Sequence, residues 1–127
     1  MVAPVVPAIT DHEIPKILEA AAAAGAQSAG YVMLRLPGAV TGLFEAWLEE
    51  HFPDRKDKVL NRVRELRGGK LYDPRFGSRM RGEGVFADQV RVLFETSQRR
   101  HGLDRPRAEL SSAAFRRPGE VVQLGLF

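Results

Sequence analysis

The chain of 127 residues contains no cysteine. This absence excludes disulfides, thiolate zinc sites and cysteine-held iron–sulfur clusters within the chain. Its three histidines, His12, His51 and His101, do not stand at a spacing typical of metal ligands. No apolar run approaches the roughly 20 residues of a membrane-spanning helix, and the N-terminus has no basic region of the kind that begins a signal peptide. We therefore expect a cytoplasmic protein that does not enter a membrane.

Acidic and basic residues are unevenly divided along the chain. Residues 1–52 carry 2 basic and 6 acidic side chains, whereas residues 53–127 carry 17 basic and 10 acidic ones, so a net charge of −4 is followed by one of +7. A basic half of this kind favours an anionic partner such as nucleic acid. An arginine-rich proteome would produce the same excess without such a partner.

The beginning of the chain has the pattern of a β-α-β unit. Residues 2–9 are β-branched and apolar on both faces, as in a buried parallel strand. Thr10 and Asp11 are residue types that cap a helix, and Gly25 suits its end. Residues 29–36 (AGYVMLRL) predict a second strand, parallel to the first through a right-handed crossover. The residues between the two strands that recur at helical spacing are Ile14, Ile17, Leu18, Ala21 and Ala24.

Two strands are too few for a sheet that is stable alone. A buried-type strand that starts almost at Met1 also has no predicted neighbour on its other side. We therefore expect that the chain begins inside a larger fold.

After the second strand the pattern becomes helical. One helix is predicted to end near Phe52, a second to stop at Gly68 and Gly69, and a third to close at Gly102. The sequence thus predicts an α/β segment over residues 1–38, a helical extension over 39–102 that contains a basic loop (70–84), and a flexible, extended tail over 103–127.

Five stretches of this sequence resemble the C-terminal third of the photolyase-like radical S-adenosylmethionine (SAM) proteins, relatives of spore photoproduct lyase. They are VAPVVPAITDHEIP, SAGYVMLRLP, WLEEHFPDR, VLNRVRELRGGKLYDPRFGSRMRGEG and the closing FRRPGEVVQLGLF. The resemblance implies a slice of a partial (β/α)6 barrel, in which residues 1–38 supply strands five and six. It also implies a lyase-type enzyme of DNA repair.

The catalytic signature of that family is a Cys-x3-Cys-x2-Cys loop, whose thiolates hold a [4Fe–4S] cluster. SAM binds the open iron, and its reductive cleavage gives a 5′-deoxyadenosyl radical that abstracts a hydrogen atom. None of these cysteines occurs in this sequence. The resemblance therefore implies a C-terminal portion that works with an upstream radical SAM core and is inactive alone.

The resemblance further implies cofactor-binding positions at the ends of the two strands. These are Val6, Pro7, Ile9, Leu34 and Arg35, which would form an apolar wall and backbone contacts for the adenine of SAM. Plain barrel core explains Val6, Ile9 and Leu34 equally well. Arg35 needs a partner in an apolar strand, which would be an acidic side chain, the SAM carboxylate or a phosphate.

The loop of residues 70–84 interleaves basic and aromatic residues. Arginine forks suit phosphates, and aromatic faces suit an unstacked base. We predict contact with nucleic acid through Lys70, Tyr72, Arg75, Phe76, Arg79 and Arg81. An irregular loop packed on the barrel, with its arginines in water, is the alternative.

The last five residues, QLGLF, resemble the peptide by which bacterial DNA enzymes bind the sliding clamp. Gln123 would bond at a pocket rim, while Leu124, Leu126 and Phe127 provide the apolar contacts. The alternative is that this tail is an edge strand or packs on its own barrel.

Three hypotheses follow for the whole chain. The first is the C-terminal portion of a radical SAM enzyme that acts on nucleic acid. The second is a basic module that binds DNA or the sliding clamp without catalysis. The third is a gene fragment that does not fold alone.

Overall fold

The computed structural model describes residues 1–106 and 109–116. Within them the chain has five α-helices and one small sheet, so the predicted α/β class is confirmed. None of the described helices is both long and apolar enough to cross a bilayer. The strands are β1 (Val2–Val5) and β2 (Tyr31–Met33), the α-helices are α1 (Ile14–Ala23), α2 (Val40–His51), α3 (Lys56–Leu66), α4 (Ser78–Arg81) and α5 (Val85–Arg100), and the short 3-10 helices are η1 (Asp11–Glu13) and η2 (Pro53–Arg55).

β1 and β2 pair in parallel and are connected through α1, as the sequence predicts. Val2 lies opposite Tyr31 and Val5 opposite Met33. On β1, Ala3 and Pro4 are exposed, and no further strand of the described residues pairs with β1. The structure thus contains a two-stranded parallel sheet, and its place in a radical SAM barrel stays a prediction.

Both strands are shorter than predicted, and β1 ends at Val5 because the chain turns at Val6. The backbone N–H groups of Ile9 and Thr10 donate to the Val6 carbonyl at 3.1 and 2.9 Å. The Thr10 hydroxyl accepts a hydrogen bond from the Val6 N–H at 2.9 Å. Thr10 does precede η1, but neither it nor Asp11 caps α1, which begins at Ile14 without a side-chain cap. Their predicted capping role is therefore wrong, because the Thr10 hydroxyl stabilises the turn instead.

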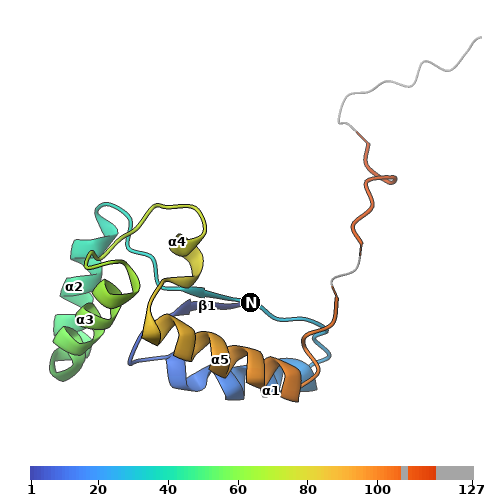
Figure 1. Ribbon diagram of the computed structural model, residues 1–127, viewed down its shortest axis with the longest axis horizontal. Coiled ribbons are helices and arrows are strands. Elements are labelled where there is room, and N and C mark those ends of the chain that lie inside the picture. The colour runs from blue at the N-terminus through green and yellow to red at the C-terminus, as the bar shows by residue number, and fades with distance from the viewer. Residues whose placement is uncertain (107–108, 117–127) are drawn as a thin grey trace, which may run out of the picture.

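The first of two core clusters lies between the strands and the helices α1 and α5. These two helices lie side by side along one side of the sheet (Figure 1). α5 comes from the predicted helical extension and Leu103 from the predicted tail, yet both belong to this core. The buried residues of the cluster are Val5, Ile14, Leu18, Tyr31, Met33, Leu66, Ala87, Val90, Phe94 and Leu103.

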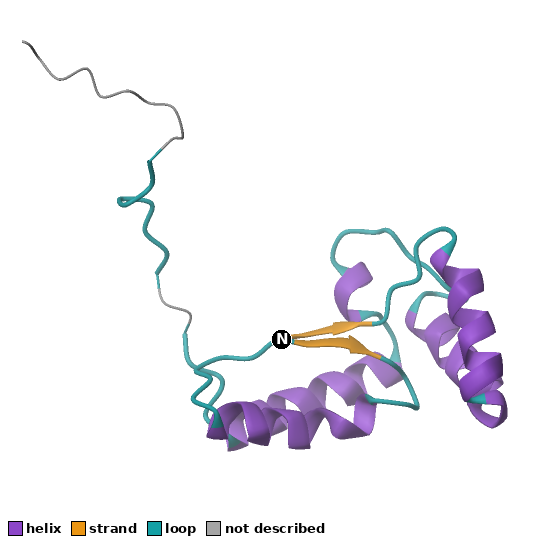
Figure 2. Cartoon of the chain, turned by 180° about the vertical axis from the view of Figure 1, so that it is seen from behind, coloured by secondary structure: helices purple, strands orange, loops and turns teal. Residues whose placement is uncertain are grey.

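The second core cluster joins the segments that follow both strands to α2 and α3. Its buried residues are Val6, Leu34, Leu36, Leu48, Val59, Leu60 and Val63. α2 and α3 therefore pack beyond the carboxyl end of the sheet (Figure 2), and α3 also contacts α5. The end of α3 and the loop after it are thereby held beside the carboxyl ends of the two strands.

Candidate functional site

The guanidinium of Arg67 connects the end of β2 to the basic loop. Arg67 follows the last residue of α3 and is only 3% exposed. Its Nη2 donates to the Leu34 carbonyl at 2.8 Å, and its Nη1 donates to the Ser78 carbonyl at 3.0 Å. Its Nε is buried without a partner among the described residues. A buried charge that joins two elements in this way fixes the loop over the carboxyl end of β2.

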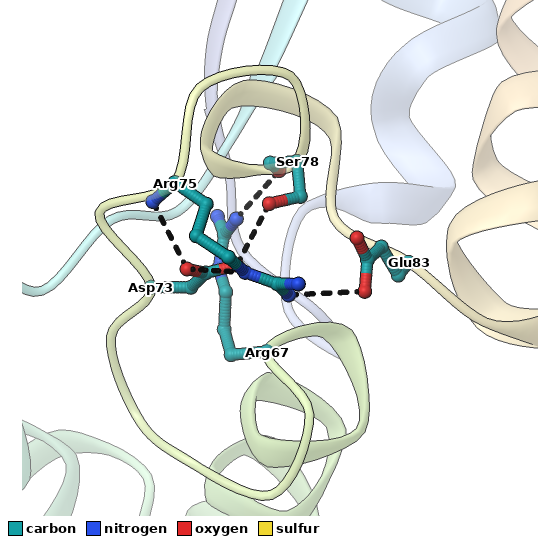
Figure 3. Close-up of polar contacts among 5 residues, drawn as sticks. All are labelled: Arg67, Asp73, Arg75, Ser78 and Glu83. Atoms are coloured by element: carbon teal, nitrogen blue, oxygen red, sulfur yellow. Dashed lines mark hydrogen bonds and ion pairs between the residues drawn. The ribbon is translucent and has the colours of Figure 1, made fainter.

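A second set of polar contacts holds the inner half of the loop, which we define as Asp73, Arg75, Ser78 and Glu83 (Figure 3). The buried Asp73 carboxylate accepts from the Arg75 backbone N–H at 3.0 Å and from the Ser78 hydroxyl at 2.7 Å. The Arg75 guanidinium donates to Asp73 at 3.0–3.1 Å and reaches Glu83 at 3.1 Å. Asp73 thus accepts hydrogen bonds from four donor atoms of Arg75 and Ser78 and holds this part of the loop together.

These contacts shift the proton affinities of the groups involved. Hydrogen bonds from the Arg75 side chain and backbone, and from Ser78, hold the pKa of Asp73 well below its ordinary value. Burial lowers the pKa of the Arg67 guanidinium; the nearby Asp73 opposes this shift and the nearby Arg35 adds to it. Asp73 is therefore a carboxylate at neutral pH, and two positive charges lie close together near the end of β2.

Arg35 is the second of those charges. It lies two residues beyond β2, and its Nη1 contacts the Met80 sulfur at 3.9 Å. Its Nε is buried without a hydrogen-bond partner, and no carboxylate among the described residues forms an ion pair with it. A thioether is a weak acceptor for a guanidinium. An acidic side chain, one of the three partners expected for Arg35, is thus not found in an ion pair with it in the described part of the chain.

The other positions predicted for SAM lie mainly in the second core. Val6 and Leu34 are each 9% exposed and pack in this core, and Pro7 is fully buried. Ile9 is partly buried and packs against the same cluster. These side chains therefore lie in or against the core, as the alternative explanation expects. Their contact with adenine stays a prediction.

A pocket of about 610 Å³ lies between the end of α3 and the inner half of the loop. Both positive and negative side chains line it, so it does not have the character of a purely anionic or cationic site. Its lining residues are Arg67, Gly68, Lys70, Tyr72, Asp73, Pro74, Arg75 and Glu83. Three of the six predicted nucleic-acid contacts, Lys70, Tyr72 and Arg75, are among them.

The outer half of the loop, which we define as Phe76 and Arg79, does not line this pocket. Phe76 is 88% exposed. The guanidinium carbon of Arg79 lies 4.0 Å from the centroid of the Phe76 ring, which is cation–π geometry. The remaining predicted contact, Arg81, lies 4.1 Å above the ring of Tyr31. The structure thus separates the six predicted residues into three that line the pocket and three that do not.

Two features, one in the loop and one just before it, were not predicted from the sequence. One is α4, a single helical turn that follows Gly77 at φ +96°. The other is the buried Arg67, which its spacing in the sequence could have revealed. Arg67 lies four residues after Val63 and seven after Leu60, so a charge falls on the apolar face of α3. A charged residue at such a position predicts a buried partner.

Two further predictions cannot be located. Gln123, Leu124, Leu126 and Phe127 lie outside the described residues, so the clamp-binding peptide stays a prediction. Among the described residues no group of three or more His, Asp or Glu side chains is placed to hold a metal ion.

Comparisons of this chain with protein families, with curated proteins and with solved structures give no match. The arrangement of the arginines is therefore the observation from which a function must be argued.

Proposed function

We propose that the chain forms the C-terminal part of a radical SAM enzyme that acts on nucleic acid, in which Arg35 binds the carboxylate of SAM. The observation that supports this proposal most is the guanidinium of Arg35, which lacks a counter-ion among the described residues. It lies just beyond β2, and ligands of parallel α/β folds bind at the carboxyl ends of the strands. A carboxylate there would accept the charge-assisted hydrogen bonds that Met80 cannot.

This proposal needs two cofactors, a [4Fe–4S] cluster and SAM, and the residues of the chain fit only the second. With no cysteine, they do not fit a thiolate-held [4Fe–4S] cluster, whose ligands would have to come from residues outside these 127. Arg35 fits the carboxylate of SAM. Bound SAM would supply a 5′-deoxyadenosyl group. Arg35 would orient the amino-acid end of SAM, and Arg67 would keep β2 and the loop in register around it.

The loop supports nucleic acid as the class of substrate. Residues 70–84 carry four basic and two acidic side chains. Arg75 is neutralised by Asp73 and Glu83. Arg79 and Arg81 form no ion pair within the described chain, so their charge is available to phosphates.

The catalytic part of the proposal is tested by fusing the chain in frame to its upstream coding sequence. The protein is purified without oxygen, and its iron content and 5′-deoxyadenosine production are measured. We expect iron-dependent cleavage of SAM by the fused protein. Arg35→Met should raise the KM for SAM about tenfold or more, since a charge-assisted pair is lost, and should leave the iron content unchanged.

The matched control is Arg91→Met, which removes a guanidinium on the surface of α5 that pairs with Asp88. It should leave both measurements as in the parent. If the chain cleaves no SAM with or without its upstream sequence, the catalytic proposal is wrong.

A second candidate function is a basic module that binds nucleic acid or the sliding clamp without catalysis. The exposed Phe76–Arg79 pair favours the nucleic-acid part, because it needs no cofactor to act. Its clamp-binding part is tested by changing Leu126 and Phe127 together to alanine, which should abolish clamp binding. Unchanged clamp binding would remove the tail from this candidate.

A further inference from the structure

We propose that Phe76 and Arg79 form a stacking platform for an unpaired nucleobase, so that the loop binds single-stranded in preference to double-stranded nucleic acid. This inference rests on the nucleic-acid substrate proposed above. It adds which form of nucleic acid is recognised and which two side chains recognise it.

The exposure of Phe76 is the first observation. At 88% exposed, its ring makes little contact with the rest of the chain. Its removal would therefore cost the fold little, and its contribution to packing does not explain its presence. An aromatic ring presented in this way offers a flat apolar face to a ligand.

The position of Arg79 is the second observation. Its guanidinium lies over the Phe76 ring at 4.0 Å. In that position the guanidinium covers one face of the ring and leaves the other face to a base, while its N–H groups stay available to a phosphate oxygen. A base that stacks on the ring and a phosphate that binds the guanidinium are the two parts of one nucleotide.

The order of the loop is the third observation. Asp73 accepts hydrogen bonds from the Arg75 backbone and from the Ser78 hydroxyl, on either side of Phe76. Arg67 holds the Ser78 carbonyl as well. The platform is therefore in place before a ligand binds, and less conformational entropy is lost on binding.

The preference for single strands follows from the geometry of base stacking. The bases of a duplex are stacked on one another and do not present a free face, whereas the bases of a single strand do. Arg81 is exposed, lies two residues after Arg79 with its guanidinium over the Tyr31 ring, and adds a positive charge to the loop for a phosphate. The positive charge of the arginines attracts single strands and duplexes alike, whereas the Phe76 ring distinguishes between them.

The experiment measures binding by fluorescence anisotropy, with the full chain and a labelled single strand of about 12 nucleotides. The same sequence as a duplex is measured in parallel. Phe76→Ala should weaken single-strand binding at least about fivefold and change duplex binding less than about twofold. Arg79→Gln should weaken both and reduce their salt dependence.

Two variants make the result specific. Phe76→Trp should keep the affinity for the single strand, and its indole fluorescence should be quenched on binding, beyond any change seen in the parent, which contains only Trp47. Phe115→Ala is the matched control, since Phe115 is also exposed, at 66%, and lies outside the loop. It should bind both forms as the parent does. Circular dichroism of each variant checks that the fold is retained.

Equal single-strand affinity of the parent and Phe76→Ala overturns the platform, as does a folded parent that binds no single strand. These outcomes are distinct from those of the catalytic proposal. A fused protein that cleaves SAM but shows no dependence on Phe76 overturns the platform alone. Binding that depends on Phe76 without any cleavage of SAM supports the platform and overturns the catalytic assignment.

Discussion

The inner and outer halves of the loop use arginine for opposite purposes. In the inner half, Arg75 forms ion pairs with Asp73 and Glu83, and these pairs stabilise the conformation of the loop. In the outer half, Arg79 lies over an exposed ring and has no carboxylate partner among the described residues. The two arginines are four residues apart in one basic segment. Only the position of the carboxylates determines which arginine stabilises the loop and which is available to a ligand.

The largest effect on stability is expected for Arg67→Met. It removes the donors of the Leu34 and Ser78 carbonyls and detaches the loop from β2. Because both carbonyls lose a charged donor, the free energy of unfolding should fall by about 2–4 kcal/mol, even though the burial of one charge is relieved. Urea denaturation measures the change. Arg64→Met on the same helix is the control and should cost less than about 1 kcal/mol, because the one hydrogen bond of its side chain among the described residues is to the exposed Asn61.

Two glycines at the end of the loop offer a sharper comparison. Gly82 and Gly84 have nearly the same backbone, with φ +79° and +88° and an extended ψ, which favours glycine strongly. A Cβ on Gly82 would lie 2.9 Å from Leu66 Cδ2, whereas one on Gly84 would meet only the Glu65 carbonyl at 3.8 Å. Gly84→Ala should cost about 1–2 kcal/mol for the backbone alone.

Gly82→Ala should cost about 1 kcal/mol more than Gly84→Ala, because Leu66 is in the first core and must shift. Thermal and urea unfolding of the two variants measure the difference. Equal losses would mean that the end of α3 adjusts without strain, and that the loop is less firmly fixed than its hydrogen bonds indicate.

The third prediction concerns pH and the inner half of the loop. Because the pKa of Asp73 is lowered in the folded state, the chain gains stability from this carboxylate above the ordinary pKa of 3.8, and loses it as the pH falls further. Asp73→Asn should therefore be less stable than the parent at pH 7, and the difference should shrink below about pH 4. Melting curves from pH 7 down to pH 2.5 test this. A constant difference across that range would contradict a role for the charge.

The smallest effect on stability is expected in the outer half. Phe76→Ala and Arg79→Gln should each change the free energy of unfolding by less than about 0.5 kcal/mol, because Phe76 is exposed and Arg79 contacts it alone among aromatic rings. Chemical denaturation measures both. A loss as large as that of Asp73→Asn at pH 7 would show that the two halves of the loop form one structural unit.

Much of the local structure could be predicted from the sequence, because it depends on local patterns. Val59, Leu60, Val63 and Leu66 recur at helical spacing, and all four are buried on one face of α3 as predicted. The parallel β-α-β order was predicted in the same way. Strand length was not, because the turn at Val6 depends on the Thr10 hydroxyl four residues later.

The parts that could not be predicted depend on contacts between distant residues. α5 packs on α1, some 70 residues away, and no local pattern indicates this choice. α4 has no apolar periodicity, and it forms where Asp73 binds the Ser78 hydroxyl. The residue types of the loop were predicted, but whether an arginine is paired or available depends on which carboxylates the fold brings near it.

The return of the chain to the beginning of β2 has a consequence for how two ligands share this molecule. Gln98 donates to the carbonyls of Ala29 and Leu103, and Ser28 bridges to Asp104. Residues 105 and 106, the next two that the structure describes, therefore leave from the amino end of β2, whereas Arg35 lies beyond its carboxyl end. A partner bound at the amino end of β2 would therefore lie at the opposite end of the strand from a nucleotide near Arg35. Two ligands at these positions would occupy separate parts of the surface and need not compete.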